Sequence, residues 1–393
     1  MLGGRGPVAQ WIEQQPSKLR VAGSIPAGAA TSQTRLSVCA CETFSYRRTA
    51  TAVAQRTRPI CLVSDFLAWL SRVDRAKKGT FVKPITSREI DAPVPARLNA
   101  ILIAAFLAVG LFQLFAVPAL LAREGIWMAL LLVPCVLSTT TNWSLIHEAI
   151  HHLLTPDRRL NDLYGRALAI FFGSPFALLR FPHLEHHRLN GTTTDRPEHF
   201  EIAKTPRPKA ALKYYPNLLF GIYAAEMAGT LACLLPLPVL RRITQLFPEA
   251  HDYASRAEKY LLQPDRLRGI RLDAIAVISV YGLAFWCYGP YWPLLALSIL
   301  GRGVLVSISD NSYHYGAALG AGPRSAYNLR LPGGAGILHF NLHRVHHLHP
   351  TLPWIGLPKA FEADSEGYDI GYAAAMLRQF RGPIPDTEYA QSS

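Results

Sequence analysis

Four long apolar stretches, separated by short or polar segments, dominate the hydrophobic pattern of this chain. A three-residue polar link separates the first two stretches, and the aromatic turn YGPYWP separates the last two. Each stretch is close to the ~20 residues that cross a bilayer as a helix. The pattern predicts an all-α integral membrane protein with two transmembrane hairpins. The four expected helices cover residues 98–122, 126–146, 272–288 and 291–309.

Two further apolar segments fit a membrane crossing less well. Residues 168–179 are short and contain Gly-Ser-Pro, so we expect them to be interfacial or buried. Residues 217–240 are long enough to span, but basic residues flank them on both sides. Basic flanks favour the cytoplasmic side of a membrane. We therefore expect residues 217–240 to be interfacial or re-entrant, with a fifth span as the alternative.

Histidines follow the apolar stretches in an ordered set, and all fourteen lie at or after residue 147. The set comprises HEAIHH, HLEHH, a lone histidine after the last apolar stretch, and HRVHH within HFNLHRVHHLHP. Residues at i, i+3 and i+4 share a helix face, so the three rings of HxxHH can point to one place. Imidazole is the commonest metal ligand. The candidate ligands are His147, His151 or His152, His183, His186, His187, His314, His343, His346 and His347.

Nine imidazoles are too many for one ion, so two metal ions are expected. Nitrogen ligation with open positions suits iron, although nickel, copper and zinc also bind imidazole. A ligating histidine usually donates its other N–H to a carboxylate or carbonyl. Candidates for that role are Glu148, Glu185, Asp195, Glu198 and Asn341. The remaining histidines, His199, His251, His339 and His349, are expected in surface or supporting roles.

The order of these boxes resembles the integral-membrane fatty acid desaturases and their hydroxylase and ketolase relatives, over about residues 96–380. In that family the corresponding histidines hold a non-haem di-iron centre that uses O₂ to introduce a C=C bond into an acyl-lipid, acyl-CoA or acyl-ACP. The resemblance implies that Asp310, with Asn311 beside it, lies where a polar residue reaches the metal through water. Some members space the first box HxxxxH, which would select His152.

The resemblance also implies an external electron donor. No HPGG haem motif, CxxC cluster or GxGxxG fingerprint occurs, and LPGG at 331–334 lacks the histidine. A ferredoxin or cytochrome b5-like protein with its reductase is therefore expected. The acyl chain would lie in an apolar tunnel, with Trp143, Phe171, Phe172, Trp286 and Trp292 as candidate lining residues.

Three other functions are compatible with parts of the pattern. A di-iron hydroxylase or carotenoid-type oxygenase would use the same boxes. A histidine-rich metal transporter would carry its ligands near the bilayer midplane, often on inverted repeats. A scaffold with a structural zinc site would need only four ligands. All the boxes are expected at one membrane face, in a helical cap on the cytoplasmic side of a bacterial inner membrane.

The N-terminal region differs from the rest in charge and composition. Residues 1–97 contain 15 Lys/Arg and 6 Asp/Glu, which is +9 of the net charge of +13, so nucleic acid is not an expected partner. The six cysteines form no CxxC pair, which argues against a zinc knuckle or disulfide scaffold. Residues 1–80 are expected to be a disordered or spurious extension, because residues 5–30 resemble a translated tRNA gene. Translation would then begin at a Val or Leu codon within 62–82, and residues 81–393 form one membrane domain.

Overall fold

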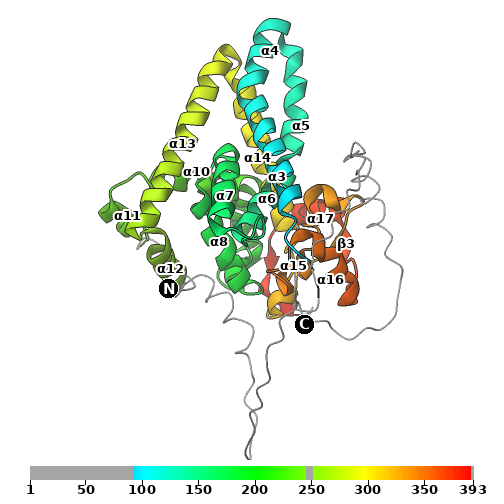
Figure 1. Cartoon of the computed structure of the whole chain (residues 1–393). Coiled ribbons are helices and arrows are strands. Elements are labelled where there is room, and N and C mark those ends of the chain that lie inside the picture. Colours follow the sequence, from blue (N-terminus) through cyan, green and yellow to red (C-terminus); the bar gives the residue numbers. More distant parts are fainter. Residues whose placement is uncertain (1–89, 91, 245–250, 391–393) are drawn as a thin grey trace, which may run out of the picture. The chain divides into compact units, whose positions relative to one another are not determined.

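The structure is a computed structural model that describes residue 90, residues 92–244 and residues 251–390. Every described residue lies within the unit Cys61–Ser393. This unit is mostly helical (Figure 1). The expected N-terminal extension at residues 1–80, with its tRNA-like stretch and alternative start, lies outside the described residues.

The first two expected spans fall within continuous helical segments long and apolar enough to cross a membrane. Pro118 has no N–H for the carbonyl four residues earlier, and the helix widens there to a π turn. Gly125 then reverses the chain with a φ of 98°. Segment Ala96–Glu124 comprises α3 (Ala96–Leu111), η1 (Phe112–Ala116) and α4 (Val117–Glu124). Segment Ile126–Ile150 comprises η2 (Ile126–Leu131), α5 (Leu132–Leu137) and α6 (Thr139–Ile150).

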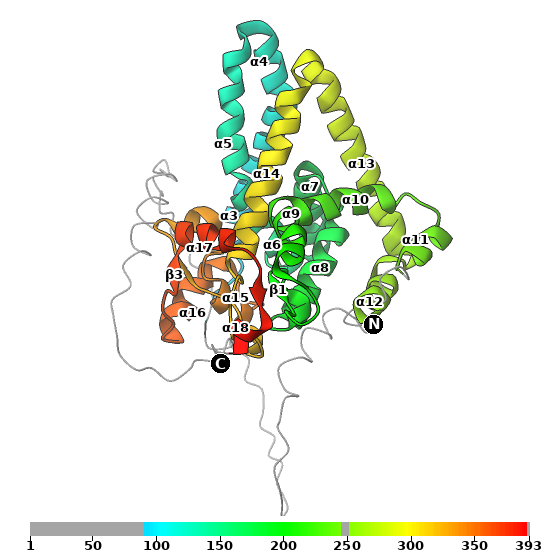
Figure 2. The ribbon, with the colours of Figure 1, turned by 180° about the vertical axis from the view of Figure 1, so that it is seen from behind.

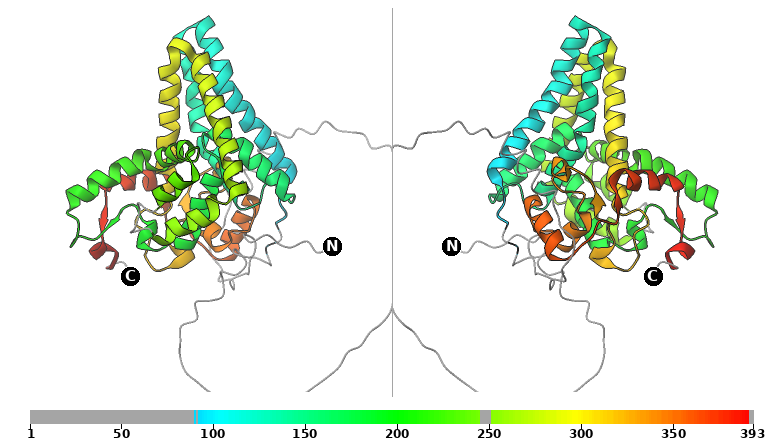
Figure 3. Two further views of the ribbon diagram at one scale, coloured as in Figure 1. Left: turned by 90° about the vertical axis from the view of Figure 1, so that its left-hand side faces the viewer. Right: turned by 90° about the vertical axis from the view of Figure 1, so that its right-hand side faces the viewer.

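The last two expected spans lie in one apolar segment, Pro264–Ser312, which folds back on itself. It comprises α13 (Pro264–Tyr288), the turn η6 (Gly289–Tyr291) and α14 (Trp292–Ser312). Hydrogen bonds join the two hairpins: Gln113 Nε2 donates to Ser298 Oγ at 3.2 Å, and Tyr288 donates to the Gln113 carbonyl at 2.7 Å. Figures 1 and 3 show both hairpins extending from the same side of the elements that carry the histidines.

A sharp bend follows the first hairpin. Helices α7 (Arg158–Phe172) and α8 (Phe176–Leu189) meet at 101° and together would make a further candidate span. Gly173 ends α7 in the left-handed conformation, and Pro175 starts α8. Four apolar side chains around the bend are buried, in agreement with the interfacial or buried character expected for residues 168–179: Leu168, Phe172, Phe176 and Leu179.

Residues 217–240 are not among the candidate spans of the described chain. They lie in η4 (Asn217–Gly221), α10 (Ile222–Ala232) and α11 (Leu237–Thr244), preceded by α9 (Arg207–Pro216) and followed by α12 (His251–Leu261). Helix α10 crosses between α13 and α14, as the crossbar of a letter A lies between its legs (Figures 1 and 2).

Arg302, a buried residue of α14, holds the bend between α7 and α8. Pro175 provides no N–H for the carbonyl of Phe171 at the end of α7. Tyr281 of α13 donates to that carbonyl, and Tyr223 of α10 donates to the carbonyl of Phe172, both at 2.6 Å. Arg302 of α14 donates to both carbonyls at 3.1 Å. Four helices therefore meet at one polar cluster, which we call the Arg302 node.

The C-terminal part is built from short helices and four two-residue strands. The helices are α15 (His343–Leu348), α16 (Leu357–Ala363), α17 (Tyr372–Arg378) and α18 (Asp386–Ala390). Strand β1 (His199–Phe200) pairs in parallel with β4 (Ile384–Pro385), and β2 (Leu329–Arg330) pairs in parallel with β3 (Ile370–Gly371). These ladders connect the C-terminal segments to the histidine-bearing region.

Candidate metal centre

Nine histidines from four separate parts of the chain come together in two adjoining groups. Helix α6 supplies two of them at its C-terminal end, α8 and α15 supply three each, and one follows α14. Group A consists of His147, His151, His183, His187 and His346. Group B consists of His186, His314, His343 and His347. In each group one nitrogen per ring lies within 4.8 Å of all the others.

The Nε2 atoms point inward in both groups. In group A the Nε2 of His183 lies 3.0 Å from those of His151 and His187. The Nε2 of His346 lies 3.0 Å from those of His147 and His187. In group B the Nε2 of His347 lies 3.2 Å from those of His186 and His343. The groups adjoin, because the rings of His187 and His347 are 4.3 Å apart.

The two HxxHH boxes each divide between the groups, which corrects the expectation that one box points to a single place. In α8 the i and i+4 rings enter group A and the i+3 ring enters group B. In α15 the assignment is reversed, with His346 alone in group A. On a helix, i+3 and i+4 diverge by about 100° around the axis, so neighbouring rings can serve two adjacent ions.

In the first box, the geometry favours His151 over His152. Helix α6 ends in a Schellman turn: Leu153 N–H donates to the Glu148 carbonyl at 2.8 Å, and His152 N–H donates to the Ala149 carbonyl at 3.1 Å. His152 occupies the left-handed position of this turn, with φ 61°. Its ring therefore turns away from group A and contacts Arg180 and Asn161. His152 therefore lies outside both groups, and this geometry does not support it as a ligand.

Two histidines of group B have their second ring nitrogen held by an acceptor. His186 Nδ1 lies 2.9 Å from Oδ2 of Asp195, one of the acceptors that the sequence offered. His314 Nδ1 donates to the Ser325 carbonyl at 3.0 Å, a contact that the sequence does not reveal. These contacts place the proton on Nδ1 and leave the lone pair of Nε2 free to bind a metal ion.

Glu148 and Asp310 lie close to the groups, but neither carboxylate has a close hydrogen bond to a histidine ring. Glu148 Oε1 is 4.0 Å from His147 Nδ1, and Glu148 Oε2 accepts from the Trp354 N–H at 3.2 Å. Asp310 accepts from Trp143 Nε1 at 3.2 Å. Both residues therefore help to shape the walls of the site.

Four other polar residues expected near the metal have hydrogen bonds or ion pairs with residues other than the histidines: Glu185, Glu198, Asn311 and Asn341. Glu185 pairs with Arg188 at 2.9 Å and Arg256 at 2.8 Å. Glu198 accepts from Tyr389 at 2.8 Å. Asn311 donates to Gln379 Oε1 at 2.7 Å, and Asn341 donates to the Leu329 carbonyl at 2.9 Å. These side chains tie α8, α14 and the C-terminal segments together.

Among the described side chains, His199, His339 and His349 lie outside both groups. His349 Nε2 lies 2.6 Å from Asp364 Oδ2, and the ring of His339 stacks on Trp354. His199 lies on β1 and its ring packs beside Tyr389. His251 is the first residue of α12.

The electrostatics of the groups fit a metal rather than protons. Burial, together with the nearby His186, lowers the pKa of His346 to about 3. Burial and neighbouring histidines also lower the pKa of His183 and His187 well below the ordinary value. Neutral imidazoles can turn the lone pairs of their Nε2 atoms toward a shared cation, which several Nε2 atoms 3.0 Å apart would surround. The nine donors therefore fit two imidazole-binding metal ions.

Sequence reasoning missed the support behind group B. Arg196 donates to the Ser325 carbonyl at 2.6 Å and to Asn190 Oδ1 at 3.2 Å. Tyr313 stacks on His343 with ring centroids 4.6 Å apart. These contacts join residues from different elements, so no short sequence motif indicates them. Only the position of Tyr313, directly before His314, could have drawn attention to it.

Comparisons with known proteins agree with this geometry. The family model "Fatty acid desaturase" matches residues 124–376, more than half of the chain. A protein of Dimorphotheca sinuata named "Delta(9) fatty acid conjugase-like enzyme" is 24% identical over 239 residues, which are 56% of this chain and 64% of that protein. The chain thus covers less than two thirds of that relative. No solved structure matches the chain significantly. The extent of the family match shows that this chain belongs to the fatty acid desaturase family.

Proposed function

We propose that this protein is an O₂-dependent membrane fatty acid desaturase with a histidine-ligated di-iron centre. The observation that carries the proposal is the convergence of nine buried imidazoles as groups A and B. Their positions follow the boxes whose order resembles the desaturases. An iron pair bound there would supply the reduction of O₂ and the removal of hydrogen from an unactivated C–H bond.

The chain's own residues would bind, orient and shield this centre. Group A would hold one ion and group B the other. Asp195 and Ser325 would fix the rings of His186 and His314 in the tautomer that leaves Nε2 free. Phe340 packs edge-on against His147 and His343, and such apolar rings would exclude water from the site.

The overall reaction needs a separate source of electrons. Removal of two hydrogens from the acyl chain, with two further electrons and two protons, reduces O₂ to two waters. The donor is proposed to be a ferredoxin or a cytochrome b5-like protein with its reductase. The sequence contains no haem, iron–sulfur or flavin motif that would serve instead.

The membrane arrangement that fits the proposal has four spans and an interfacial α10. Both hairpins return the chain to its starting side, which keeps groups A and B on one face. The basic residues around 217–240 favour the cytoplasmic face of a bacterial inner membrane. A further full crossing by α10 would separate His314 from His183, which belong to adjoining groups.

A related hydroxylase, conjugase or carotenoid-type oxygenase would use the same metal groups. The name of the Dimorphotheca relative is the reason to include a conjugase among these alternatives. A metal transporter is less compatible, because its ligands are expected near the bilayer midplane. Here the groups lie where α6 and α14 end, away from the tips of the hairpins.

Expression in a host that lacks desaturases, followed by mass spectrometry of total fatty acids, tests the proposal. We expect a new unsaturated fatty acid with the wild-type chain and none with His186→Ala. A hydroxylated product would move the assignment to the hydroxylases. An active His186→Ala variant would contradict the metal-site assignment.

A further inference from the structure

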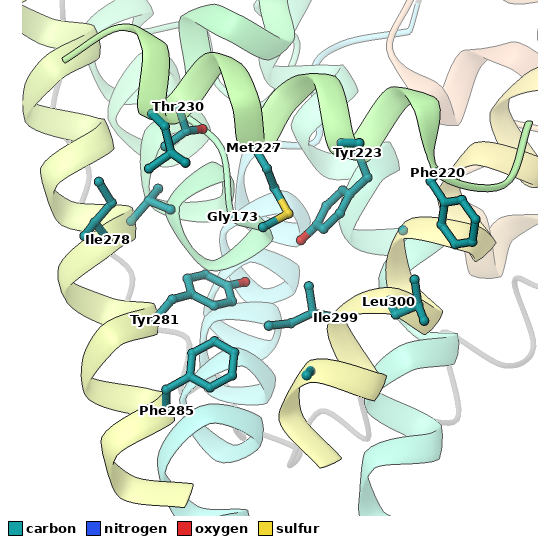
Figure 4. Close-up of a pocket in the computed structure, with 15 residues that line it drawn as sticks. Gly173, Phe220, Tyr223, Met227, Thr230, Ile278, Tyr281, Phe285, Ile299 and Leu300 are labelled. Carbon is teal, nitrogen blue, oxygen red and sulfur yellow. The ribbon is translucent and has the colours of Figure 1, made fainter. Parts of the chain in front are cut away.

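Two sides of helix α10 differ in character. One side lines an apolar pocket of about 430 Å³ with Tyr223 and Met227, and Glu226 is not among the residues that line this pocket (Figure 4). Glu226 shares another face with Gly229 and Cys233, at i, i+3 and i+7. That face packs against α8: a Cβ on Gly229 would lie 3.4 Å from Leu178, and Cys233 belongs to a buried cluster that includes Leu178. Glu226 therefore lies on the side of α10 that meets the helix carrying the second histidine box.

The carboxyl of Glu226 lacks the partners that the neighbouring carboxyls have. Its Oε2 is shielded from solvent and has no hydrogen-bond partner among the described residues. By contrast, Glu148, Asp195 and Asp310 each have a partner. A shielded carboxylate without a partner is costly, whereas the neutral acid is far less so. Burial and the nearby Asp310 accordingly raise the pKa of Glu226 to about 8.

Asp310 lies between Glu226 and the two histidine groups. Among the described groups, its charge is the one that acts on Glu226. Asp310 precedes His314 of group B by four residues, about one helical turn. Its Oδ1 accepts from Trp143, whose ring meets that of His183 in group A with centroids 6.4 Å apart. This contact leaves Oδ2 of Asp310 available to carry a proton.

The proposed reaction takes up protons at a site from which water is largely excluded. Reduction of O₂ to two waters uses two hydrogens of the acyl chain and two protons from elsewhere. The buried imidazoles would be occupied as metal ligands, and Asp195 is held by His186. Of the carboxyls described around the groups, Glu226 is the one that holds a proton and has no other partner.

From this arrangement we propose that Glu226 holds a proton and passes it through Asp310 to the oxygen atoms of O₂ as they are reduced. The proposal rests on the proposed function and deepens it. The acid of Glu226 gives its proton to the carboxylate of Asp310, and the acid of Asp310 gives a proton to oxygen. Glu226 is partly exposed, so it can take the next proton from water. Two protons pass in each turnover, and neither carboxyl gains or loses electrons.

Three substitutions test this assignment. Glu226→Gln keeps the shape of the side chain but cannot release the proton, and Glu226→Asp keeps an acid. Glu258→Gln is the matched control, because it removes a carboxyl of α12 that pairs with Arg241 away from the histidines. Lysates of the expressing host, supplied with NADPH, are used to measure product and O₂ uptake against pH. Iron per chain is measured on the purified proteins.

We expect Glu226→Gln to lower product formation by about 100-fold, since a positioned acid contributes ~10²–10⁴-fold. Iron per chain should stay at the wild-type value, and O₂ uptake per product should rise, with H₂O₂ released. Wild-type activity should fall above about pH 8, where Glu226 loses its proton, and this fall should be absent from Glu226→Gln. Glu226→Asp should regain part of the activity and its pH dependence, and Glu258→Gln should behave as the wild type.

A second readout does not depend on activity. Infrared spectra of the purified iron-loaded wild type should contain a carboxylic acid C=O band that shifts in D₂O and disappears above about pH 8. The band should be absent from Glu226→Gln and present in Glu258→Gln. Its absence from the wild type would overturn the proposal.

The outcomes separate the relay from the proposed function. An active wild type with unchanged product and O₂ uptake in Glu226→Gln would overturn the relay alone. Loss of product together with an equal loss of iron would also overturn it, because Glu226 would then act through the fold. A wild type that binds iron and shows the infrared band, but forms no product with any saturated fatty acid, would contradict the proposed function and the relay with it.

Discussion

Each histidine of the candidate metal centre must present Nε2 while its other nitrogen is kept protonated. For His186 this depends on Asp195, whose carboxylate lies 2.9 Å from Nδ1. Loss of such an outer partner typically weakens metal binding or activity by about 10–100-fold. We therefore expect Asp195→Asn to lower iron occupancy and product formation within that range, measured as iron per chain and product per protein.

Glu185 offers a matched control for this prediction. It lies on α8 between His183 and His186, but it pairs with Arg188 and Arg256 and not with a histidine. Glu185→Gln should lower thermal stability while iron content stays near the wild-type value. Equal iron loss in the Asp195 and Glu185 variants would show that both act only through the packing of α8.

Glu226 of α10 makes a separate prediction about pH. Its Oε2 has no hydrogen-bond partner among the described residues, and burial with the nearby Asp310 raises the pKa of Glu226 to about 8. The folded protein therefore binds this proton between pH 4.5 and 8, where the unfolded chain releases it. The contribution of this group makes stability fall as pH rises through that window.

Glu226→Gln removes this ionisation while keeping the shape of the side chain. We expect the variant to unfold at a higher temperature than the wild type at pH 8, and the two to converge near pH 4.5. Thermal unfolding in detergent across this pH range measures the difference. A constant difference between the two proteins at all pH values would contradict the assigned protonation of Glu226.

At the residue scale, the boxes included the nine histidines that the structure brings together, but they did not reveal all of their surroundings. Spacing alone cannot show that His152 occupies the left-handed turn position, because this depends on how α6 ends. Nor can it show that Glu185 and Asn341 point to partners outside the histidine groups. Asp195 lies beside His186, whereas these two residues have partners elsewhere, because the direction of a side chain is set by tertiary packing.

At the element scale, the Arg302 node joins α10, α13 and α14 to the end of α7, directly before α8, which carries the second histidine box. The apolar pattern predicted α14 as a span but gave no role to the arginine inside it, and a charge at that depth is costly unless it is paired. Its partners are main-chain carbonyls of α7, which no sequence pattern reveals. The node holds the bend from which α8 departs.

Replacing Arg302 by Met should therefore do more than lower stability. The Phe171 and Phe172 carbonyls keep their tyrosine donors, so we expect a loss of about 1–3 kcal/mol in the free energy of unfolding. Because α8 loses its fixed bend, iron per chain should also fall. Thermal unfolding and metal analysis of the same preparation measure both effects.

Arg271→Met provides the comparison, since Arg271 also donates to helix-end carbonyls, those of Cys233 and Leu235 after α10. We expect this variant to lose stability with little change in iron. If Arg302→Met loses stability and retains as much iron as Arg271→Met, the node does not position the histidines of α8.

At the scale of the whole molecule, the hydrophobic pattern predicted the two hairpins well, because long uncharged stretches have few alternatives to membrane helices. The pattern indicated only that residues 168–179 and 217–240 are not ordinary spans. It did not predict the α7–α8 bend or the position of α10 between α13 and α14. The apolar pocket beside α10 was not predicted, because its wall is built from residues far apart in the sequence, including Gly173, Tyr223 and Leu300. Trp286, one of the residues expected to line a tunnel, is 78% exposed on the outer face of α13.

Metal analysis of the protein purified from membranes tests the central claim most directly. Groups A and B predict about two irons per wild-type chain, and about one or fewer in both His346→Ala and His186→Ala, because each variant removes a donor from a different group. His199→Ala, outside both groups, should retain the wild-type value. A wild-type protein with one zinc and no iron, or one whose iron is unaffected by either group variant, would contradict a di-iron centre built from these nine histidines.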